Sequence, residues 1–363
     1  MINLARCSFL SVFSLLLFGN IQSEEYPGAR WTESPWERVS PESSGMKTEQ
    51  LHRARDYALT GGGSGRVIVR GKRVLAWGDQ EMPYDLKSTS KSIGVTLLGI
   101  ALKDEKVKWD DSAARFHPNF AVPPESNRET DWIPKITIRM LVDQTAGFDK
   151  PGKDARLLFE PGTMWNYSDA GPNWLAECLT LVYGRDLNEI LLERVLAPIG
   201  VTTKDIRWRK HAYRPEKIEG ITNREFGSGF HANVNALSRI GYLYLREGKW
   251  QNEQLLPTEF VRGLSRSENR ADLPTYRHGD KDEFGPAARH YSTLWWNNAD
   301  ETIPEVPRDA FWAWGLYDSL IFVVPSLDLV AVRAGHSWPR KSDAGHYDVL
   351  KPFFVPLVAA CSE

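Results

Sequence analysis

Ser88-Thr89-Ser90-Lys91 is the stretch that decides the expected fold, because it places a hydroxyl and an amine one helical turn apart. The apolar run over residues 92–101 follows it and predicts a buried helix. Side chains at positions i and i+3 share one face of a helix, so Lys91 can reach the Ser88 oxygen.

This pair has the chemistry of a nucleophile and its base. Serine is a weak nucleophile until a base takes its proton, and a desolvated lysine can be that base. Ser88 also stands at the predicted helix start, where unpaired backbone N–H groups favour developing negative charge. Taken alone, the tetrad is also compatible with an ordinary polar first turn, because Ser-x-x-Lys arises often by chance.

Length and charge narrow the classes of function. The chain has 363 residues, enough for one large domain or two, and a formal net charge of −2. Its 45 basic residues are scattered rather than arranged along one face. These features argue against partners such as nucleic acid or an anionic membrane surface.

The first residues predict an export signal. Arg6 is followed by an apolar run of about a dozen residues, Cys7 to Phe18, which is too short to span a bilayer comfortably. We expect a signal peptide over residues 1–23 and an extended lead-in over 24–45. The mature chain is then expected to be periplasmic or secreted, with no stable membrane insertion.

Strand patterns occur near both ends of the chain. Residues 66–70 and 73–77 flank Gly71-Lys72 and predict a β-hairpin, whereas residues 311–315, 320–324 and 329–333 predict a second β group. We therefore expect an α/β (α+β) catalytic unit in which residues 46–105 and 305–363 build an antiparallel sheet. Residues 106–304 form a helical region beside it, and the cleft between the two is the expected ligand site.

A second motif completes the pattern. Pro161-Gly162-Thr163 is followed by Tyr167-Ser168-Asp169, and with Ser88-x-x-Lys91 the chain resembles the penicillin-recognising serine hydrolases. The similarity lies in the branch of class C β-lactamase-related esterases, 6-aminohexanoate-dimer hydrolases and DD-peptidases. It extends over about residues 36 to 357 and implies a β-lactamase/transpeptidase-like fold.

The resemblance implies a role for each motif residue. Ser88 would become an acyl-enzyme, and Lys91 and Tyr167 would share the base chemistry, with the choice between them left open. The backbone N–H groups of Ser88 and Gly315 would form the oxyanion hole. The resemblance implies no metal or organic cofactor.

Three positions depart from the family pattern. Ala313-Trp314-Gly315 stands where penicillin-processing enzymes carry Lys-Thr-Gly or His-Thr-Gly, so the cation that would hold a substrate carboxylate is missing. Asp169 replaces a common Asn and can accept but not donate a hydrogen bond, so it either contacts substrate differently or pairs with a cation such as Lys91. Gln144-Thr145-Ala146-Gly147 replaces a His-Thr-Ser-Gly run, a loop that we interpret as structural.

The remaining candidates concern substrate and thiol chemistry. Trp314 and Tyr317 either line an apolar acyl pocket or pack in the core. Cys178 and Cys361 remain after removal of the signal, and the sequence does not show whether they pair.

We expect a serine hydrolase that forms a Ser88 acyl-enzyme on a small ester or amide, carboxylesterase-like in activity. The alternative activities are those of an amidase or DD-peptidase and of a β-lactamase. A catalytically silent, penicillin-binding-like sensor is the alternative from another class.

Overall fold

The computed structural model describes residues 36–266, 272–279, 283–342 and 344–361. The predicted export signal and most of the predicted lead-in therefore lie outside the described residues. Within the described ranges, no helix is both long and apolar enough to cross a membrane.

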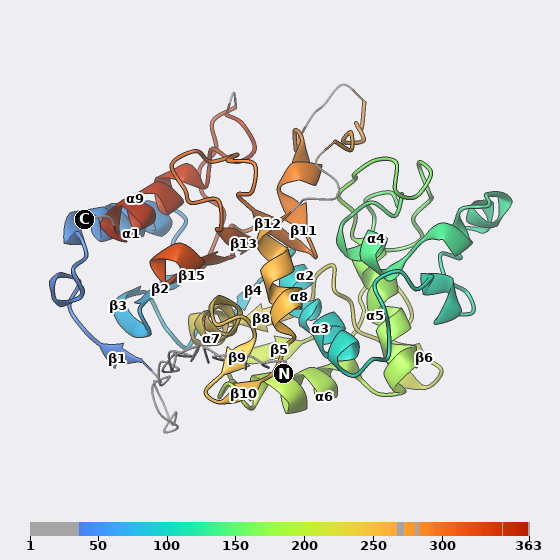
Figure 1. Cartoon of the computed structure of the whole chain (residues 1–363), viewed down its shortest axis with the longest axis horizontal. Helices are drawn as coiled ribbons and strands as arrows, with labels where there is room; N and C mark the ends of the chain where they lie inside the picture. Colours follow the sequence, from blue (N-terminus) through green and yellow to red (C-terminus); the bar gives the residue numbers. More distant parts are fainter. Residues whose placement is uncertain (1–35, 267–271, 280–282, 343, 362–363) are drawn as a thin grey trace, which may run out of the picture.

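One eight-stranded sheet organises the structure (Figure 1). Its strand order is β1-β3-β2-β15-β14-β13-β12-β11, and all neighbours are antiparallel except the parallel pair β1 and β3. The strands are β1 Glu37–Arg38, β2 Ser64–Val69, β3 Lys72–Trp77, β11 Tyr291–Ser292, β12 Trp295–Asn297, β13 Phe311–Trp314, β14 Leu320–Val324 and β15 Leu329–Ala334.

The sheet joins the two ends of the chain. The predicted hairpin is confirmed as β2 and β3, and the predicted C-terminal strands are confirmed as β13, β14 and β15. The two groups meet where β15 pairs with β2 in antiparallel register. The sheet also takes β1 from the expected lead-in and β11 and β12 from the expected helical range, so it extends beyond residues 46–105 and 305–363. These strands are only two or three residues long, too short to show an alternating pattern.

Strand β14 shows how the two faces of the sheet are covered. Ile321 and Val323 face α7 (Val234–Leu245), where a Cβ on Gly241 would lie 2.8 Å from the Ile321 side chain. Phe322 points to the opposite face and stacks on Phe354 of α9 (Lys351–Cys361), with ring centroids 3.8 Å apart. Because successive side chains of a strand alternate in direction, this apolar run is covered on both faces.

Helices build the rest of the molecule. The predicted helix over residues 48–59 is confirmed as α1, which packs beside the closing helix α9 (Figure 1). The sequence after Ser88 forms two consecutive helices, α2 (Thr89–Gly94) and α3 (Thr96–Lys103), where one helix was expected. The other α-helices besides α7 and α9 are α1 Thr48–Leu59, α4 Ile138–Val142, α5 Ala170–Tyr183, α6 Leu187–Leu191 and α8 Thr258–Arg262.

Short strands complete the region between the two ends of the chain. Strands β4 (Tyr84–Asp85), β8 (Phe230–Ala232) and β5 (Ile206–Trp208) form a three-stranded sheet in the order β4-β8-β5. Two small hairpins also occur, β6 Lys217–Ile218 with β7 Ile221–Thr222, and β9 Lys249–Trp250 with β10 Glu253–Gln254.

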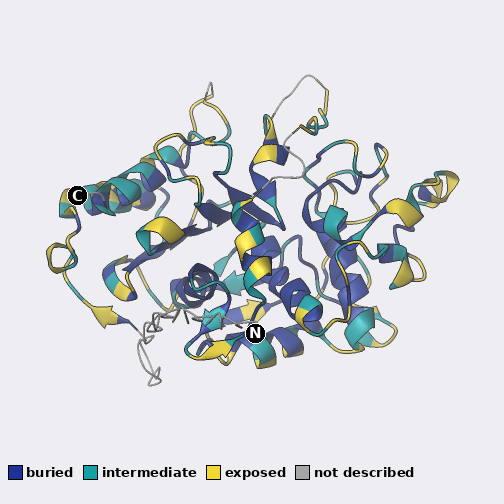
Figure 2. Ribbon diagram, in the orientation of Figure 1, coloured by how far each residue is buried: buried dark blue, intermediate teal, exposed yellow. Residues whose placement is uncertain are grey.

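Buried residues concentrate in the large sheet and in the adjoining helices (Figure 2). Cys178 is buried in α5 and Cys361 ends α9; within the described residues both thiols are free. Burial raises the pKa of the Cys178 thiol, as expected for an unreactive core cysteine.

The packing of Phe322 predicts a large effect on stability. Phe322 and Phe354 are both completely buried, so Phe322→Ala removes a ring and leaves a cavity. We expect a loss of about 3–5 kcal/mol in the free energy of unfolding, measured by urea denaturation. Phe322→Leu, which keeps most of the volume, should lose less; equal losses for both variants would contradict the role of ring stacking.

Candidate active site

The buried hydroxyls of helix α2 tie it to three separate segments. Thr89 Oγ1 donates to the Ser319 carbonyl at 2.7 Å, and Ser92 Oγ donates to the Leu294 carbonyl at 2.7 Å. Ser90 Oγ accepts the Phe230 N–H at 3.1 Å. The polar composition of this helix therefore has a structural reason, because each hydroxyl satisfies a backbone group from another part of the chain.

Ser88 lies at the N-cap of α2 with its side chain partly accessible. Its N–H donates to no acceptor among the described residues, so this group is available to an external acceptor. The residue before it, Lys87, has a left-handed backbone with φ of 50°. The Lys87 ammonium is held by Asp85 at 2.7 Å and lies 5.0 Å from the centre of the Tyr317 ring.

The Lys91 ammonium is buried and fully hydrogen-bonded. It donates to Ser88 Oγ at 3.0 Å, to the Gly227 carbonyl at 2.9 Å and to the Asp169 carboxylate. An ammonium has three donors, and these three acceptors use all of them. The predicted contact between Lys91 and Ser88 is therefore present in the structure.

The surroundings of Lys91 favour its charged form. Burial lowers the pKa of this amine, but the Asp169 carboxylate and the Tyr167 hydroxyl together outweigh that effect and raise the pKa above its usual value. These contacts favour the ammonium form of Lys91, which stabilises negative charge and holds the serine oxygen.

Tyr167 approaches the Lys91 ammonium from the loop that precedes α5. Its ring lies 5.0 Å from the Lys91 ammonium. It packs against Phe284 and Trp296, with centroid distances of 5.4 and 5.9 Å, and these two rings are 6.1 Å from each other. The three predicted motif residues thus meet around the Lys91 ammonium, and aromatic packing fixes the plane of the tyrosine ring.

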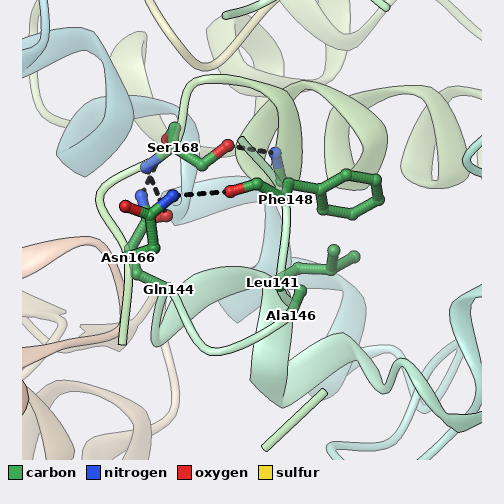
Figure 3. A pocket seen from close by; sticks show the side chains of 8 residues that line it. Leu141, Gln144, Ala146, Phe148, Asn166 and Ser168 are labelled. Atoms are coloured by element: carbon green, nitrogen blue, oxygen red, sulfur yellow. Dashed lines mark hydrogen bonds between the residues drawn. The ribbon is translucent and has the colours of Figure 1, made fainter. Parts of the chain in front are cut away.

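Gln144 fixes the backbone next to Tyr167 (Figure 3). Its side-chain amide donates to the Ser168 carbonyl and accepts the Ser168 N–H, both at 2.9 Å. Asn166 adds a hydrogen bond to the Phe148 carbonyl at 2.7 Å. The interpretation of the Gln144 loop as structural fits this geometry, and the loop holds the segment that carries Tyr167.

Asp169 acts as the counter-ion of Lys91. Its carboxylate contacts the ammonium, and about one third of its side chain remains exposed. Of the two roles considered for this residue, the geometry supports pairing with the lysine. Asn in the same place would leave the buried ammonium without a compensating negative charge.

The expected oxyanion donor on β13 needs a correction. The Gly315 N–H donates to the Ser319 carbonyl at 3.1 Å, so it is already used within the β13–β14 connection. The next amide, that of Leu316, donates to no acceptor in the described part of the chain. Because Gly315 packs directly on the turn before Thr89, Leu316 N–H is the better partner for the Ser88 N–H.

Trp314 and Tyr317 take different positions. Trp314 is buried, its indole N–H donates to Asp318 at 2.9 Å, and its ring packs on His346. It therefore belongs to the aromatic packing behind the site, so of the two roles considered for Trp314 the structure supports core packing and not the tentative substrate-binding one. Tyr317 is half-buried beneath Lys87 and lies at the mouth of the site.

Two groups of the site were missed from the sequence. The Gly227 carbonyl holds Lys91, and a Cβ at this position would lie 3.3 Å from Asp169. Glu225, two residues earlier, is completely buried against Arg209. The two glycines that flank Ser228 were the only feature of the sequence that could have pointed to this segment. Every residue type has a backbone carbonyl, so the sequence cannot indicate which carbonyl accepts the Lys91 hydrogen bond.

The carboxyl group of Glu225 has an unusual protonation behaviour. Burial raises its pKa to about 7; the Arg209 guanidinium opposes this effect and the Asp169 carboxylate adds to it.

No group of three or more His, Cys, Asp or Glu side chains within the described residues is arranged to hold a metal ion.

Glu225 predicts a pH-dependent stability. Its pKa is higher in the folded chain than the ordinary 4.5, so its stabilising contribution is complete below pH 4.5 and is lost as pH rises through 7. The loss is on the order of 3 kcal/mol at most. In Glu225→Gln, unfolding stability measured in urea should fall less between pH 5 and pH 8 than in the unmodified chain.

Asp205 is the matched control for this experiment. It is also buried, but hydrogen bonds from Thr202, Asn233 and Asn235 outweigh burial and lower its pKa. Asp205→Asn should therefore lower stability about equally at every pH from 5 to 8. An unchanged pH slope in Glu225→Gln would show that Glu225 does not titrate in this range.

Solved structures with the same architecture come from several kinds of protein. A family VIII carboxylesterase aligns with a TM-score of 0.63 at 16% identity, covering 86% of this chain and 98% of its own. A Bacillus anthracis protein named as a 6-aminohexanoate-dimer hydrolase aligns with a TM-score of 0.62 at 15% identity, covering 82% and 78%. A penicillin-binding protein homologue from Caulobacter crescentus aligns with a TM-score of 0.61 at 15% identity, covering 86% and 96%.

At these identities the structural likeness establishes the β-lactamase/transpeptidase-like fold. A comparison with curated protein sequences found no match. The profile of the Beta-lactamase family, however, matches residues 56–350, which is most of the chain and includes every residue of the site described above. The protein therefore belongs to the β-lactamase family of hydrolases.

Proposed function

We propose that this chain is an exported serine hydrolase that forms an acyl-enzyme on Ser88 and cleaves a small carboxylic ester. The observation that carries the proposal is the arrangement around Lys91. A single buried ammonium holds the Ser88 oxygen at 3.0 Å and also contacts Tyr167. A nucleophile and a potential base that both lie next to one fixed cation suit acyl transfer.

Acylation uses Tyr167 as the base. In this scheme Tyr167 acts as a phenolate, and the Lys91 ammonium beside it compensates the negative charge. The phenolate oxygen takes the proton of the Ser88 hydroxyl and becomes a neutral phenol. Ser88 Oγ attacks the ester carbonyl and forms a C–O bond. The negative carbonyl oxygen then accepts hydrogen bonds from the N–H groups of Ser88 and Leu316.

Deacylation repeats these steps with water. Collapse of the first tetrahedral intermediate breaks the bond to the alcohol, which takes the proton held by Tyr167. A water molecule then gives a proton to Tyr167 and attacks the acyl carbon. When this second intermediate collapses, the proton returns to Ser88 Oγ and the carboxylic acid leaves.

The proposal favours an ester because the end of β13 has no cation at the position of Trp314. A cation on this strand would bind the carboxylate of a penicillin or a peptide, and Trp314 occupies that position with its N–H already bonded to Asp318. An ester also has the better leaving group, so it requires less assistance than an amide. The fold likeness to the family VIII carboxylesterase agrees with this choice.

Two other functions remain to be compared with this one by experiment. An amidase or DD-peptidase is the nearest, since the structural neighbours include the proteins named as a 6-aminohexanoate-dimer hydrolase and a penicillin-binding protein homologue. A silent binding protein is the other. Export is proposed from the sequence of residues 1–23 alone.

The nucleophile is tested by Ser88→Ala. Hydrolysis of a short-chain p-nitrophenyl ester by the mature protein should fall by at least about 10³-fold, because the acyl-enzyme cannot form. The melting temperature should be nearly unchanged, since the Ser88 side chain is partly exposed and accepts one hydrogen bond from Lys91. A fluorophosphonate probe should label the unmodified chain once and the variant not at all.

Ser90→Ala is the matched control in the same helix. Ser90 is completely buried and holds the Phe230 N–H, so its loss should cost about 1 kcal/mol of stability while turnover stays within a few-fold. Activity that survives in Ser88→Ala and disappears in Ser90→Ala would show that Ser90, and not Ser88, is the nucleophile. No labelling of the unmodified chain would favour the silent binder.

The role of Lys91 is tested by the pH profile of Asp169→Asn. Removing this carboxylate takes away the main influence that raises the pKa of Lys91 and leaves the burial that lowers it. If charged Lys91 is required, the alkaline limb of kcat/KM should move to lower pH. Asp169→Glu, which keeps the charge, should move it less.

The opposite shift would reverse the assignment of the base. Were the free amine of Lys91 to take the Ser88 proton, a lower pKa would populate the active form at lower pH. The acid limb of the profile would then move down in Asp169→Asn, and activity below neutral pH would rise relative to the unmodified chain.

A further inference from the structure

The turn between β13 and β14 is held from inside by a buried carboxylate. Asp318 is completely buried, and its oxygens accept hydrogen bonds from the Trp314 indole at 2.9 Å and the Trp338 N–H at 2.8 Å. Arg340 adds two more, at 2.7 and 3.0 Å. Four donors from two parts of the chain therefore meet on one side chain.

Arg340 supplies the charge that makes this burial favourable. A carboxylate removed from water is costly unless a cation and hydrogen bonds compensate it, and a guanidinium that binds both oxygens also fixes their direction. Arg340 follows β15, whereas Asp318 precedes β14, so the pair connects two segments. The Arg340 side chain is 44% exposed, so shortening it leaves no large cavity.

Asp318 controls the peptide group that carries the proposed oxyanion donor. Its N–H donates to the Gly315 carbonyl at 2.8 Å. In a trans peptide the C=O and the following N–H point in opposite directions. The hydrogen bond on the Gly315 carbonyl therefore directs the Leu316 N–H away from Asp318, and a shift of Asp318 would turn that N–H.

A second buried cation restrains the rest of the turn. Arg333 of β15 donates to the Tyr317 carbonyl at 2.6 Å and to the Asp318 carbonyl at 3.2 Å. Its other contacts are with backbone carbonyls outside the turn, those of Gly61, Gly62 and His336. Arg333 thus restrains the carbonyl groups, Ser337 Oγ donates to the Leu316 carbonyl at 2.9 Å, and the Asp318 carboxylate adds the ionic link to Arg340.

We propose that Asp318 and Arg340 are positioning residues that align the Leu316 N–H with the Ser88 N–H. The inference rests on the proposed acyl transfer at Ser88 and names the side chains that set its oxyanion geometry. Neither residue touches substrate in this scheme. They act through the Gly315–Leu316 peptide, whose donor stabilises the tetrahedral intermediate more than the bound ester.

The test compares Arg340→Gln and Arg340→Lys in p-nitrophenyl ester hydrolysis. With Gln we expect kcat to fall about 10- to 100-fold, below the full loss of one oxyanion donor, while KM changes less than about threefold. The Ki of a boronic acid that forms a tetrahedral adduct with Ser88 should rise by the same factor as kcat/KM falls. Lys, which keeps the charge, should recover part of both losses.

Arg194→Gln provides a matched control. Arg194 also binds both oxygens of a carboxylate, that of Asp104 at 3.0 Å each, and its side chain is 37% exposed. This pair lies at the end of α3, away from the Ser88 turn. Its loss should lower the melting temperature less than Arg340→Gln does, because the Asp104 side chain stays 21% exposed, while kcat and the boronic acid Ki stay within twofold.

The outcomes separate this inference from the proposed function. If hydrolysis depends on Ser88 but Arg340→Gln keeps kcat and boronic acid affinity, the positioning role is wrong and the function stands. If the loss of kcat follows only the fraction of unfolded protein, the role is purely structural and the inference is also wrong. An unmodified chain that neither hydrolyses esters nor reacts at Ser88 would overturn both.

Discussion

The site depends on one buried ammonium and its three acceptors. The Lys91 ammonium donates hydrogen bonds to three acceptors. They are the Ser88 hydroxyl at the start of α2, the Asp169 carboxylate at the start of α5 and the Gly227 carbonyl in the segment before β8. A buried cation tolerates no vacant donor, so these three segments are held to a common point. The same carboxylate raises the pKa of Lys91 against the effect of burial.

Other buried polar contacts fix how the large sheet sits against the helical region. Thr89 and Ser92 join α2 to the β13–β14 turn and to the β11–β12 turn. Gly315 completes this contact, because a Cβ there would lie 2.2 Å from the Leu86 carbonyl. Hydrophobic burial stabilises the two parts, but these directional contacts set their register, since hydrogen bonds weaken steeply when geometry changes.

Local patterns in the sequence were sufficient for the longer elements and for the Ser88–Lys91 pair, whereas Tyr167 was assigned from the family resemblance. The hairpin over 66–77, helix α1 and the strands after residue 310 each have a strong period or turn signal. The Ser88–Lys91 contact follows from helical spacing alone. The Gly315 assignment failed because it depended on which neighbour each N–H faces, and β11 and β12 are too short to carry a strand pattern.

What the sequence by itself determined is therefore the set of elements, the antiparallel fold and the meeting of Ser88, Lys91 and Tyr167. Only the tertiary structure decided that Asp169 pairs with Lys91, that Leu316 replaces Gly315 as the free donor among the described residues, and that Trp314 packs inward. The physical reason is that protonation and hydrogen-bond direction depend on groups distant in sequence. Asp169, the Gly227 carbonyl and the Asp318–Arg340 pair act on the site only after the chain has folded.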